Sequence, residues 1–215
     1  MLSAKHRLLE IFRKTSFKSS NEPVFRLASG KRSKYYVDCK QALSYPEARG
    51  LIGELILPLV RDEPLDAIGG LELGAYPIAT SVSDAIFRRT NRTVRAFVIR
   101  KEPKTHGVTD LIAGDVRKGD KALIVDDVVT SGQSTVQAIK RAREAGLSVD
   151  RVIVLVDREE DGGRRHIEAQ GVEFCALFTL SDFLGACNDH LQNADGNRYQ
   201  RGSVRKHSGS AVPAR

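Results

Sequence analysis

The stretch KALIVDDVVTSGQS at residues 121–134 decides the fold and indicates the chemistry. Apolar residues lead into the adjacent carboxylates of Asp126 and Asp127, and a loop of hydroxyl side chains and one glycine then opens a helical segment. A buried strand followed by a short turn and a helix is the repeating unit of α/β folds with parallel sheets. Ligands of such sheets bind beyond the carboxyl ends of the strands, so we expect the functional site at this turn.

The turn has the composition of an anion-binding loop. Hydroxyl donors come from Thr130, Ser131 and Ser134, Gly132 lets the backbone approach a ligand closely, and the helix N-terminus offers free N–H groups. The two aspartates would repel phosphate, and we expect them to face sugar hydroxyls, a developing cation or a magnesium ion. The order of acids and loop therefore indicates a sugar phosphate. The alternative is a hydroxyl helix cap preceded by surface acids. The absence of a GxxxxGK[ST] string argues against a P-loop nucleotidase.

On both sides of this turn, short apolar runs alternate with helical stretches. The helical segment 132–145, for example, carries Val136, Ile139 and Ala142 on one face. This alternation predicts an α/β fold, a parallel sheet flanked by helices on both faces. The runs expected as strands are 66–70, 95–99, 122–125, 151–156 and 173–178.

The two ends of the chain differ from this pattern. Alternating apolar residues at 25–27 and 35–39 flank a Ser29-Gly30-Lys31 turn and predict a hairpin, and apolar spacing after Pro46 predicts a helix. From residue 188 the chain is rich in Asn, Gly, Ser and Arg and has no apolar period. We therefore expect one domain over residues 1–187 and a basic, disordered tail over 188–215.

The composition limits the class of protein. The chain has 215 residues, of which 41% are hydrophobic and 28% charged, which excludes a collagenous, coiled-coil or wholly disordered protein. The longest apolar run, 55–60, is too short to cross a membrane and contains Pro58. The cysteines, three in number, are widely spaced and fit neither a disulfide framework nor a paired zinc site. They suit a reducing compartment, and we expect a cytoplasmic protein.

A net charge of +7 predicts an anionic partner, whether nucleic acid, membrane surface or phosphorylated small molecule. Basic side chains gather between residues 88 and 104 and lead into the string RKEPKTHG at 100–107. Its cations, Arg100, Lys101 and Lys104, together with His106 form a plausible clamp for a pyrophosphate leaving group. Donors at the departing oxygen stabilise the transition state more than the ground state. The alternative is an ordinary solvated loop.

These motifs resemble the type I phosphoribosyltransferases, and among them the orotate phosphoribosyltransferase family, from Phe25 to Leu184. The matching segments are FRLASGKRSKYYVDCK, GGLELGAYPIA, RKEPKTHG, DDVVTSGQS and the strand end Val156-Asp157-Arg158. The resemblance implies the type I phosphoribosyltransferase fold, with a small N-terminal hood formed by the hairpin and helix. It also implies transfer of ribose 5-phosphate from phosphoribosyl diphosphate to orotate, giving orotidine 5′-phosphate and pyrophosphate on the way to UMP.

The resemblance assigns roles to numbered residues. Asp126, Asp127, Lys104 and His106 are expected to be catalytic, the aspartates by holding ribose hydroxyls and steadying an oxocarbenium-like sugar. Phosphoribosyl diphosphate is expected to bind Arg100, Lys101, Lys104, His106, Asp126, Asp127, Val128, Val129, Thr130, Ser131, Gly132, Gln133 and Ser134. Orotate is expected to contact Thr130 and Arg158. The alternative for Arg158 is an ion pair with Asp157, Glu159 or Glu160.

The family resemblance also implies a cofactor and an assembly. Mg²⁺ is expected mainly on the substrate's own oxygens, so that no protein ligand is named. The cationic loop of the family reaches the neighbouring subunit's site, which implies a homodimer with shared active sites.

Three positions depart from the family pattern. Ala28 stands where many relatives have lysine, Glu72 where threonine is usual, and Ala113 where an acid is usual. Glu72 would repel pyrophosphate, unless it helps to bind magnesium or marks a changed base preference. Two alternative functions remain: transfer to another base, or a non-catalytic nucleotide sensor that binds nucleic acid through residues 88–95 and the tail. The low aromatic content of 6% and the intact RKEPKTHG string make nucleic-acid binding the weaker interpretation.

Overall fold

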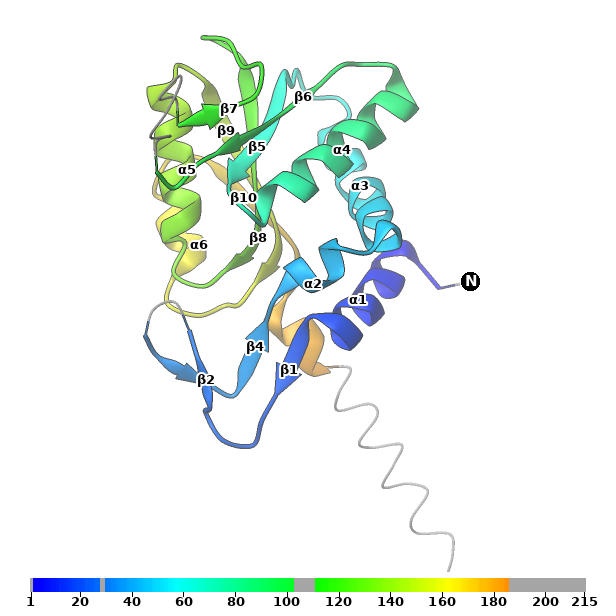
Figure 1. The fold of residues 1–215 in the computed structure, drawn as a ribbon, viewed down its shortest axis with the longest axis vertical. Coiled ribbons are helices and arrows are strands. Elements are labelled where there is room, and N and C mark those ends of the chain that lie inside the picture. Colours follow the sequence, from blue (N-terminus) through cyan, green and yellow to red (C-terminus); the bar gives the residue numbers. More distant parts are fainter. Residues whose placement is uncertain (1, 28–29, 103–110, 186–215) are drawn as a thin grey trace, which may run out of the picture. The chain divides into compact units, whose positions relative to one another are not determined.

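The computed structural model describes residues 2–27, 30–102 and 111–185 (Figure 1). Residues Met1–Phe183 form one unit and Leu184–Arg215 a second. Ala28, Lys104, His106 and the expected tail at 188–215 lie outside the described residues.

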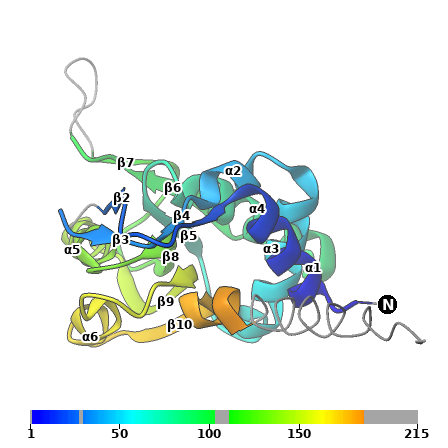
Figure 2. The same ribbon diagram turned by 90° about the horizontal axis from the view of Figure 1, so that it is seen from below.

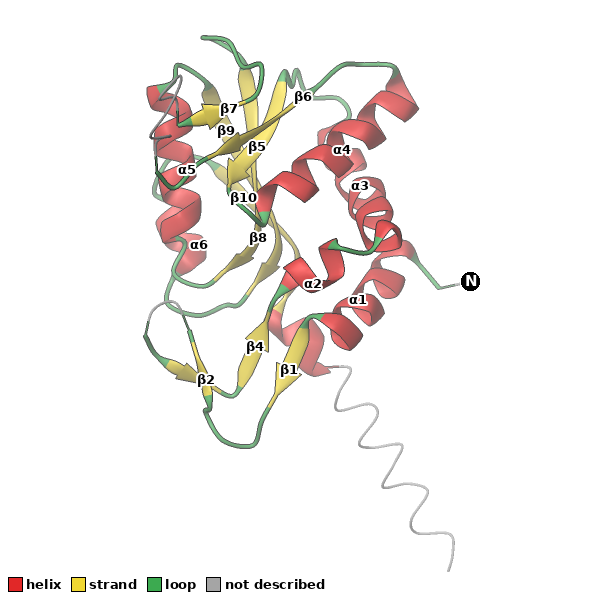
Figure 3. Cartoon of the chain, in the orientation of Figure 1, coloured by secondary structure: helices red, strands yellow, loops and turns green. Residues whose placement is uncertain are grey.

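A six-stranded sheet, in the order β10-β9-β8-β5-β6-β7, occupies the centre of the first unit (Figure 3). All its strands run parallel except β7, which is antiparallel to β6. Their bounds are β5 (Ala67–Leu71), β6 (Arg95–Ile99), β7 (Ile112–Ala113), β8 (Lys121–Val129), β9 (Ser148–Asp157) and β10 (Glu173–Thr179). The predicted parallel sheet is confirmed, and the short edge strand β7 is an addition to it.

Strand β8 is longer than the sequence pattern predicts. The sequence pattern predicts a strand that ends before Asp126. In the structure β8 continues through Asp126 and Asp127 to Val129, because the neighbouring strand β9 extends to Asp157 and pairs with this part of β8. Asp126 lies opposite Val154 and Val129 opposite Asp157 in this parallel pair. The turn therefore begins at Thr130, and the carboxylates project from the end of the strand itself.

Helices cover both faces of the sheet (Figures 1 and 2). On one face α4 (Ala75–Thr90) contacts β5, β6 and β8, and α3 (Pro46–Val60) packs against α4. On the other face lie α5 (Gln133–Glu144) and α6 (Gly163–Glu168). The buried side of α5, with Ala138, Ile139 and Ala142, belongs to the core cluster that includes Ile124 and Val152. No helix in the described ranges has both the length and the hydropathy of a membrane span.

The N-terminal elements form the hood. They are α1 (Ala4–Thr15), β1 (Phe17–Ser19), β2 (Phe25–Arg26), β3 (Arg32–Ser33), β4 (Tyr35–Val37) and α2 (Cys39–Leu43). The predicted pairing of 25–27 with 35–39 is wrong, because β2 pairs with β3 and the second predicted strand, β4, pairs with β1. Phe17 stacks on Tyr35 and on Phe183, with ring centroids 6.1 and 5.2 Å apart, and these contacts draw β4 toward β1. The hood thus rests on the segment that follows β10.

Candidate active site

The phosphate loop, Thr130–Ser134, connects the end of β8 to α5 and lies directly on α6. Gly132 has a φ of 75°, which favours glycine, and a Cβ atom there would lie 2.8 Å from the carbonyl oxygen of Gly163. His166 Nδ1 lies 2.9 Å from the carbonyl oxygen of Ser131. The N–H groups of the first turn of α5 have no partner within the helix, and they are available to an anion. The loop therefore presents hydroxyls and helix N–H groups at one point, and phosphate binding there stays a prediction.

Asp126 is buried under this loop. Its Oδ2 accepts hydrogen bonds from the hydroxyls of Thr135, at 2.7 Å, and Ser134, at 3.2 Å, and its Oδ1 accepts one from the Asp127 N–H at 3.0 Å. Burial, together with the neighbouring Asp127 carboxylate, raises the pKa of Asp126 to about 7, although the hydroxyl contacts oppose this shift. Asp126 thus fixes the first turn of α5.

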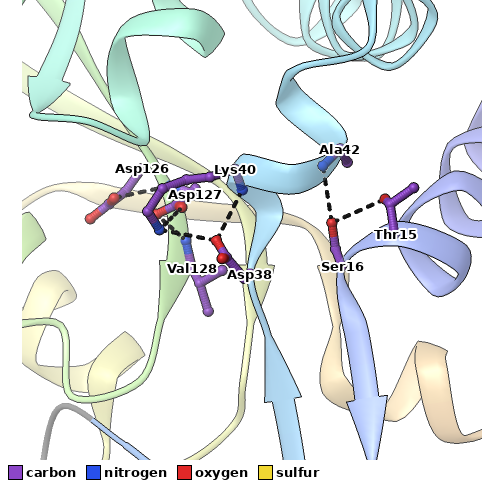
Figure 4. A network of polar contacts seen from close by, with 8 residues as sticks. All are labelled: Thr15, Ser16, Asp38, Lys40, Ala42, Asp126, Asp127 and Val128. Carbon is purple, nitrogen blue, oxygen red and sulfur yellow. Dashed lines mark hydrogen bonds and ion pairs between the residues drawn. The ribbon is translucent and has the colours of Figure 1, made fainter.

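Asp127 faces the hood (Figure 4). Its Oδ2 lies 3.3 Å from Nζ of Lys40, which also donates to Asp38 Oδ1 at 3.2 Å. A Cβ atom at Gly74 would collide with the Asp127 carboxylate, so the turn between β5 and α4 must approach without a side chain. Burial lowers the pKa of Lys40, but the Asp127 and Asp38 carboxylates outweigh it and raise that pKa above its ordinary value. Lys40 is therefore a charged partner of the acid pair.

A chain of polar contacts sets the position of Lys40 (Figure 4). Asp38 caps α2 by accepting the Lys40 N–H at 3.2 Å, and the Asp38 N–H donates to the Ser16 carbonyl at 2.9 Å. The Ser16 hydroxyl accepts the Ala42 N–H at 3.3 Å. Lys40 ends the family-matching segment FRLASGKRSKYYVDCK, but sequence reasoning gave it no role, because its partner Asp127 lies 87 residues away.

Arg158 follows β9 and is 2% exposed. Its Nε and Nη2 donate to Glu160 Oε2 at 3.1 and 2.9 Å, which is the ion pair considered as the alternative to orotate binding. Nη2 also contacts Ser33 Oγ and the Tyr35 carbonyl, each at 3.2 Å, and thereby joins the hood to the sheet. Nη1 makes no hydrogen bond to the described residues. The Arg158 N–H donates to the Val129 carbonyl at 2.9 Å, which brings Arg158 beside Thr130.

A pocket of about 890 Å³ opens over the phosphate loop. Its lining includes Leu71, Lys101, Val128 and the whole Thr130–Ser134 loop, and it continues along α5 and α6 to His166 and Gln170. Val129 is buried in the core and does not line it. The structure therefore brings Lys101 together with the predicted phosphate loop, whereas Asp126, Asp127 and Arg158 lie outside this pocket.

The first residues of the cationic loop are held by side chains from two other elements. The Lys101 N–H donates to Glu72 Oε1 at 2.9 Å, and Arg141 donates to the carbonyls of Arg100 and Lys101. Ala113 lies in β7, where it pairs with Val98. In the described part of the chain, no three His, Cys, Asp or Glu side chains cluster as a metal site.

The chain is similar in sequence to proteins of one family. The family model for the phosphoribosyl transferase domain matches residues 41–176. The chain is similar to orotate phosphoribosyltransferase of Aquifex aeolicus, with 44% identity over 86% of this chain and 100% of that protein. The corresponding protein of Methanocaldococcus jannaschii is 41% identical over 74% of this chain and 85% of its own length.

Solved structures give the same result. Orotate phosphoribosyltransferase of Mycobacterium tuberculosis H37Rv in complex with Fe(III) dicitrate superposes with a TM-score of 0.72 and 34% identity, covering 84% of this chain and 99% of the other. The same enzyme in complex with 5-phospho-α-D-ribosyl 1-diphosphate superposes with a TM-score of 0.67 and 31% identity, covering 85% and 93% of the two chains.

Proposed function

The chain belongs to the orotate phosphoribosyltransferase family, and from this premise we propose that it transfers ribose 5-phosphate from phosphoribosyl diphosphate to orotate. The bond from the anomeric carbon to the diphosphate oxygen breaks, and its electron pair leaves with pyrophosphate. A ring nitrogen of orotate bonds to that carbon and releases its proton, giving orotidine 5′-phosphate for the synthesis of UMP. The observation that carries the proposal is the adjacency of an acid pair, an anion loop and a buried arginine at the ends of β8 and β9.

At the sugar end, we assign the 5′-phosphate to Thr130–Ser134 and the ribose hydroxyls to the acid pair, with Asp127 the more accessible of the two. Support comes from the contacts of Asp126, whose two oxygens are already engaged by Ser134, Thr135 and the Asp127 N–H. Asp126 and Asp127 together stabilise the positive charge that develops on the sugar, because a fixed carboxylate near a developing cation acts mainly in the transition state.

At the leaving group, Arg100, Lys101, Lys104 and His106 are assigned to pyrophosphate. Lys101 lines the pocket over the phosphate loop, which supports its part in this assignment. Each charge-assisted contact to a phosphate oxygen contributes roughly 1.5–3 kcal/mol. The loss of one such contact is therefore expected to slow turnover without unfolding the protein.

At the base, we assign Thr130 and Arg158 to orotate. The ion pair with Glu160 uses Nε and Nη2 of Arg158. Nη1 remains for the carboxylate or a carbonyl of the pyrimidine, since a guanidinium can serve two planar acceptors at once. The ion pair and the substrate contact are thus compatible functions of the same side chain.

Magnesium is proposed as the cofactor, and the donors at the site fit it. The Asp127 carboxylate is a hard oxygen donor at this edge, whereas both Asp126 oxygens are already engaged, so Mg²⁺ would be held mainly by the substrate's own oxygens and by water. When bound, the ion would neutralise charge on the diphosphate.

We also propose a cytoplasmic homodimer with shared active sites. The cytoplasmic assignment rests on the widely spaced cysteines. Support for the dimer comes from large apolar side chains at and after the turn that precedes α4. Leu73 is 75% exposed, Tyr76 47% and Phe87 53%, and these side chains are the candidates for the subunit contact.

The test of the proposed function is a spectrophotometric assay with purified protein, phosphoribosyl diphosphate and Mg²⁺. We expect the absorbance of orotate to fall with time and to remain constant when phosphoribosyl diphosphate is omitted. Uracil, adenine and hypoxanthine at the same concentration serve as controls for base selectivity. Turnover of one of these bases without turnover of orotate would contradict the proposal.

A further inference from the structure

Glu72, which departs from the family pattern, follows β5 at the same edge of the sheet as the acid pair. Its backbone N–H donates to the Ile99 carbonyl at 2.9 Å and so continues the pairing of β5 with β6. Its side chain reaches two residues beyond Ile99 and accepts the Lys101 N–H at 2.9 Å. One Glu72 oxygen is thus engaged by a peptide group at the start of the cationic loop.

Arg141 holds the same backbone from the opposite direction. It projects from α5, the helix whose N-terminus forms part of the phosphate loop, and donates Nη2 to the Lys101 carbonyl at 2.9 Å and Nη1 to the Arg100 carbonyl. Hydrogen bonds that involve a charged group are roughly twice as strong as neutral ones. The peptide group between Arg100 and Lys101 is therefore held by a carboxylate at its N–H and by a guanidinium at its carbonyl, and the same guanidinium also holds the Lys101 carbonyl.

The residues that follow position 110 pair with the same short segment of backbone. The Arg100 N–H donates to the Leu111 carbonyl at 2.8 Å, and Ile99 pairs with Ile112 in the β6–β7 ladder. Lys101 is thereby the first residue beyond the ladder, and its side chain lines the pocket beside Thr130–Ser134. A lysine just beyond the end of a strand loses much conformational freedom when it binds, and a fixed backbone reduces that cost.

We propose that Glu72 and Arg141 are positioning residues, which hold the Lys101 peptide so that its ammonium group meets the phosphorylated substrate over the phosphate loop. This inference rests on the proposed function. It gives Glu72 a role other than binding magnesium or selecting the base. Arg141 also makes α5 a physical link between the phosphate loop and the start of the cationic loop.

The experiment compares Glu72→Ala, Glu72→Gln and Arg141→Met with the wild type in steady-state kinetics. We expect Glu72→Ala and Arg141→Met to lower kcat/KM for phosphoribosyl diphosphate by about tenfold, the loss typical of one charge-assisted hydrogen bond. The KM for orotate and the half-maximal magnesium concentration should change less than twofold. Glu72→Gln keeps an acceptor oxygen and should stay within about threefold of the wild type. Glu144→Gln, on the exposed end of α5, removes a carboxylate without touching the loop and is the matched control.

A second measurement separates this inference from the proposed function. Hydrogen–deuterium exchange at the Lys101 amide should accelerate by at least about tenfold in Glu72→Ala, since its acceptor is lost, while the β5 amides keep their rates. Binding of phosphoribosyl diphosphate, measured by calorimetry, should weaken in parallel. A wild type that does not consume orotate refutes the proposed function, and exchange and binding then still decide the inference.

Three results would overturn the inference. The first is unchanged Lys101 exchange and unchanged phosphoribosyl diphosphate kinetics in Glu72→Ala. The second is a shift of its magnesium dependence alone, which would favour a metal-binding Glu72. The third is a changed base preference with normal phosphoribosyl diphosphate kinetics, which would favour a role in specificity.

Discussion

The phosphate loop and the hood meet at the same acid pair, but they are built in opposite ways. In the loop, the Asp126 carboxylate binds Ser134 and Thr135, eight and nine positions further along the chain. In the hood, Lys40 reaches Asp127 across 87 positions, and Ser33 reaches Arg158 across 125. The loop is a local structure, whereas the hood contacts form only when segments far apart in the sequence have folded together.

This difference suggests that the loop and the hood contribute to different steps of the reaction. Local hydrogen bonds fix the loop before the substrate arrives, which suits a group that must stabilise charge in the transition state. Contacts between distant segments depend on the packing of α1, β1 and β4 against the sheet. Changes in the loop should therefore affect turnover most, and changes in the hood should affect substrate affinity most.

Asp127→Asn has the largest expected effect and tests the acid pair at which the loop and the hood meet. We expect kcat to fall by about 100-fold, because a fixed carboxylate beside the developing positive charge is replaced by a neutral amide of the same shape. The melting temperature should change little, since the amide fills the same space as the carboxylate. The measurement is turnover of orotate at saturating substrates together with a thermal melt. A kcat within threefold of the wild type would show that the acid pair does not act in the chemical step.

Lys40→Met is the corresponding change on the hood side. We expect KM for phosphoribosyl diphosphate to rise by about tenfold with a smaller change in kcat, because the ammonium group that bridges Asp38 and Asp127 is lost. Lys40→Arg, which retains the charge, should recover most of the affinity. A large fall in kcat at unchanged KM would contradict the division between loop and hood.

Asp126→Asn tests the stability of the loop without substrate. Because the folded pKa of Asp126 is raised from 3.8 to about 7, the folded state holds the proton more tightly than the unfolded state. The contribution of Asp126 to the free energy of unfolding therefore falls as pH rises from about 4 to 7. The asparagine of the variant has no proton to lose in this range, so its contribution does not change with pH. We expect the melting temperature of the variant, relative to the wild type, to rise by roughly 10 °C across this range, since a shift of about three pKa units corresponds to about 4 kcal/mol and about 1 kcal/mol to roughly 2–4 °C. A constant difference would show that the carboxyl group does not titrate there.

Lys31→Ala should have the smallest effect. Lys31, in the hairpin turn of the hood, pairs with Asp161 after β9, but its side chain is 69% exposed. Exposed ion pairs contribute little to stability and are screened by salt. We expect KM for orotate to change less than twofold in a kinetic assay at 0.15 M salt. A tenfold rise would give the hood turn a direct part in base binding.

The sequence predicts those parts of the molecule that depend on local pattern. The parallel sheet, its flanking helices and the phosphate loop follow from apolar periodicity and from the hydroxyl-rich turn at 130–134. The longer β8 and the pairing of β4 with β1 could not be predicted, because each depends on a partner strand elsewhere in the chain. Lys40 and Glu72 lie in segments that match the family, but the contacts through which they act are with distant residues, and no local pattern predicts those contacts.

The direct packing of Gly132 on the first turn of α6 limits how the donor specificity of this enzyme can be redesigned. Since no methyl group fits between the loop and Gly163, a loop with more room requires that α6 itself move. This helix belongs to the crossover between β9 and β10. Accepting a donor with a group bulkier than a phosphate at this loop would therefore call for a longer crossover rather than for substitutions within the loop.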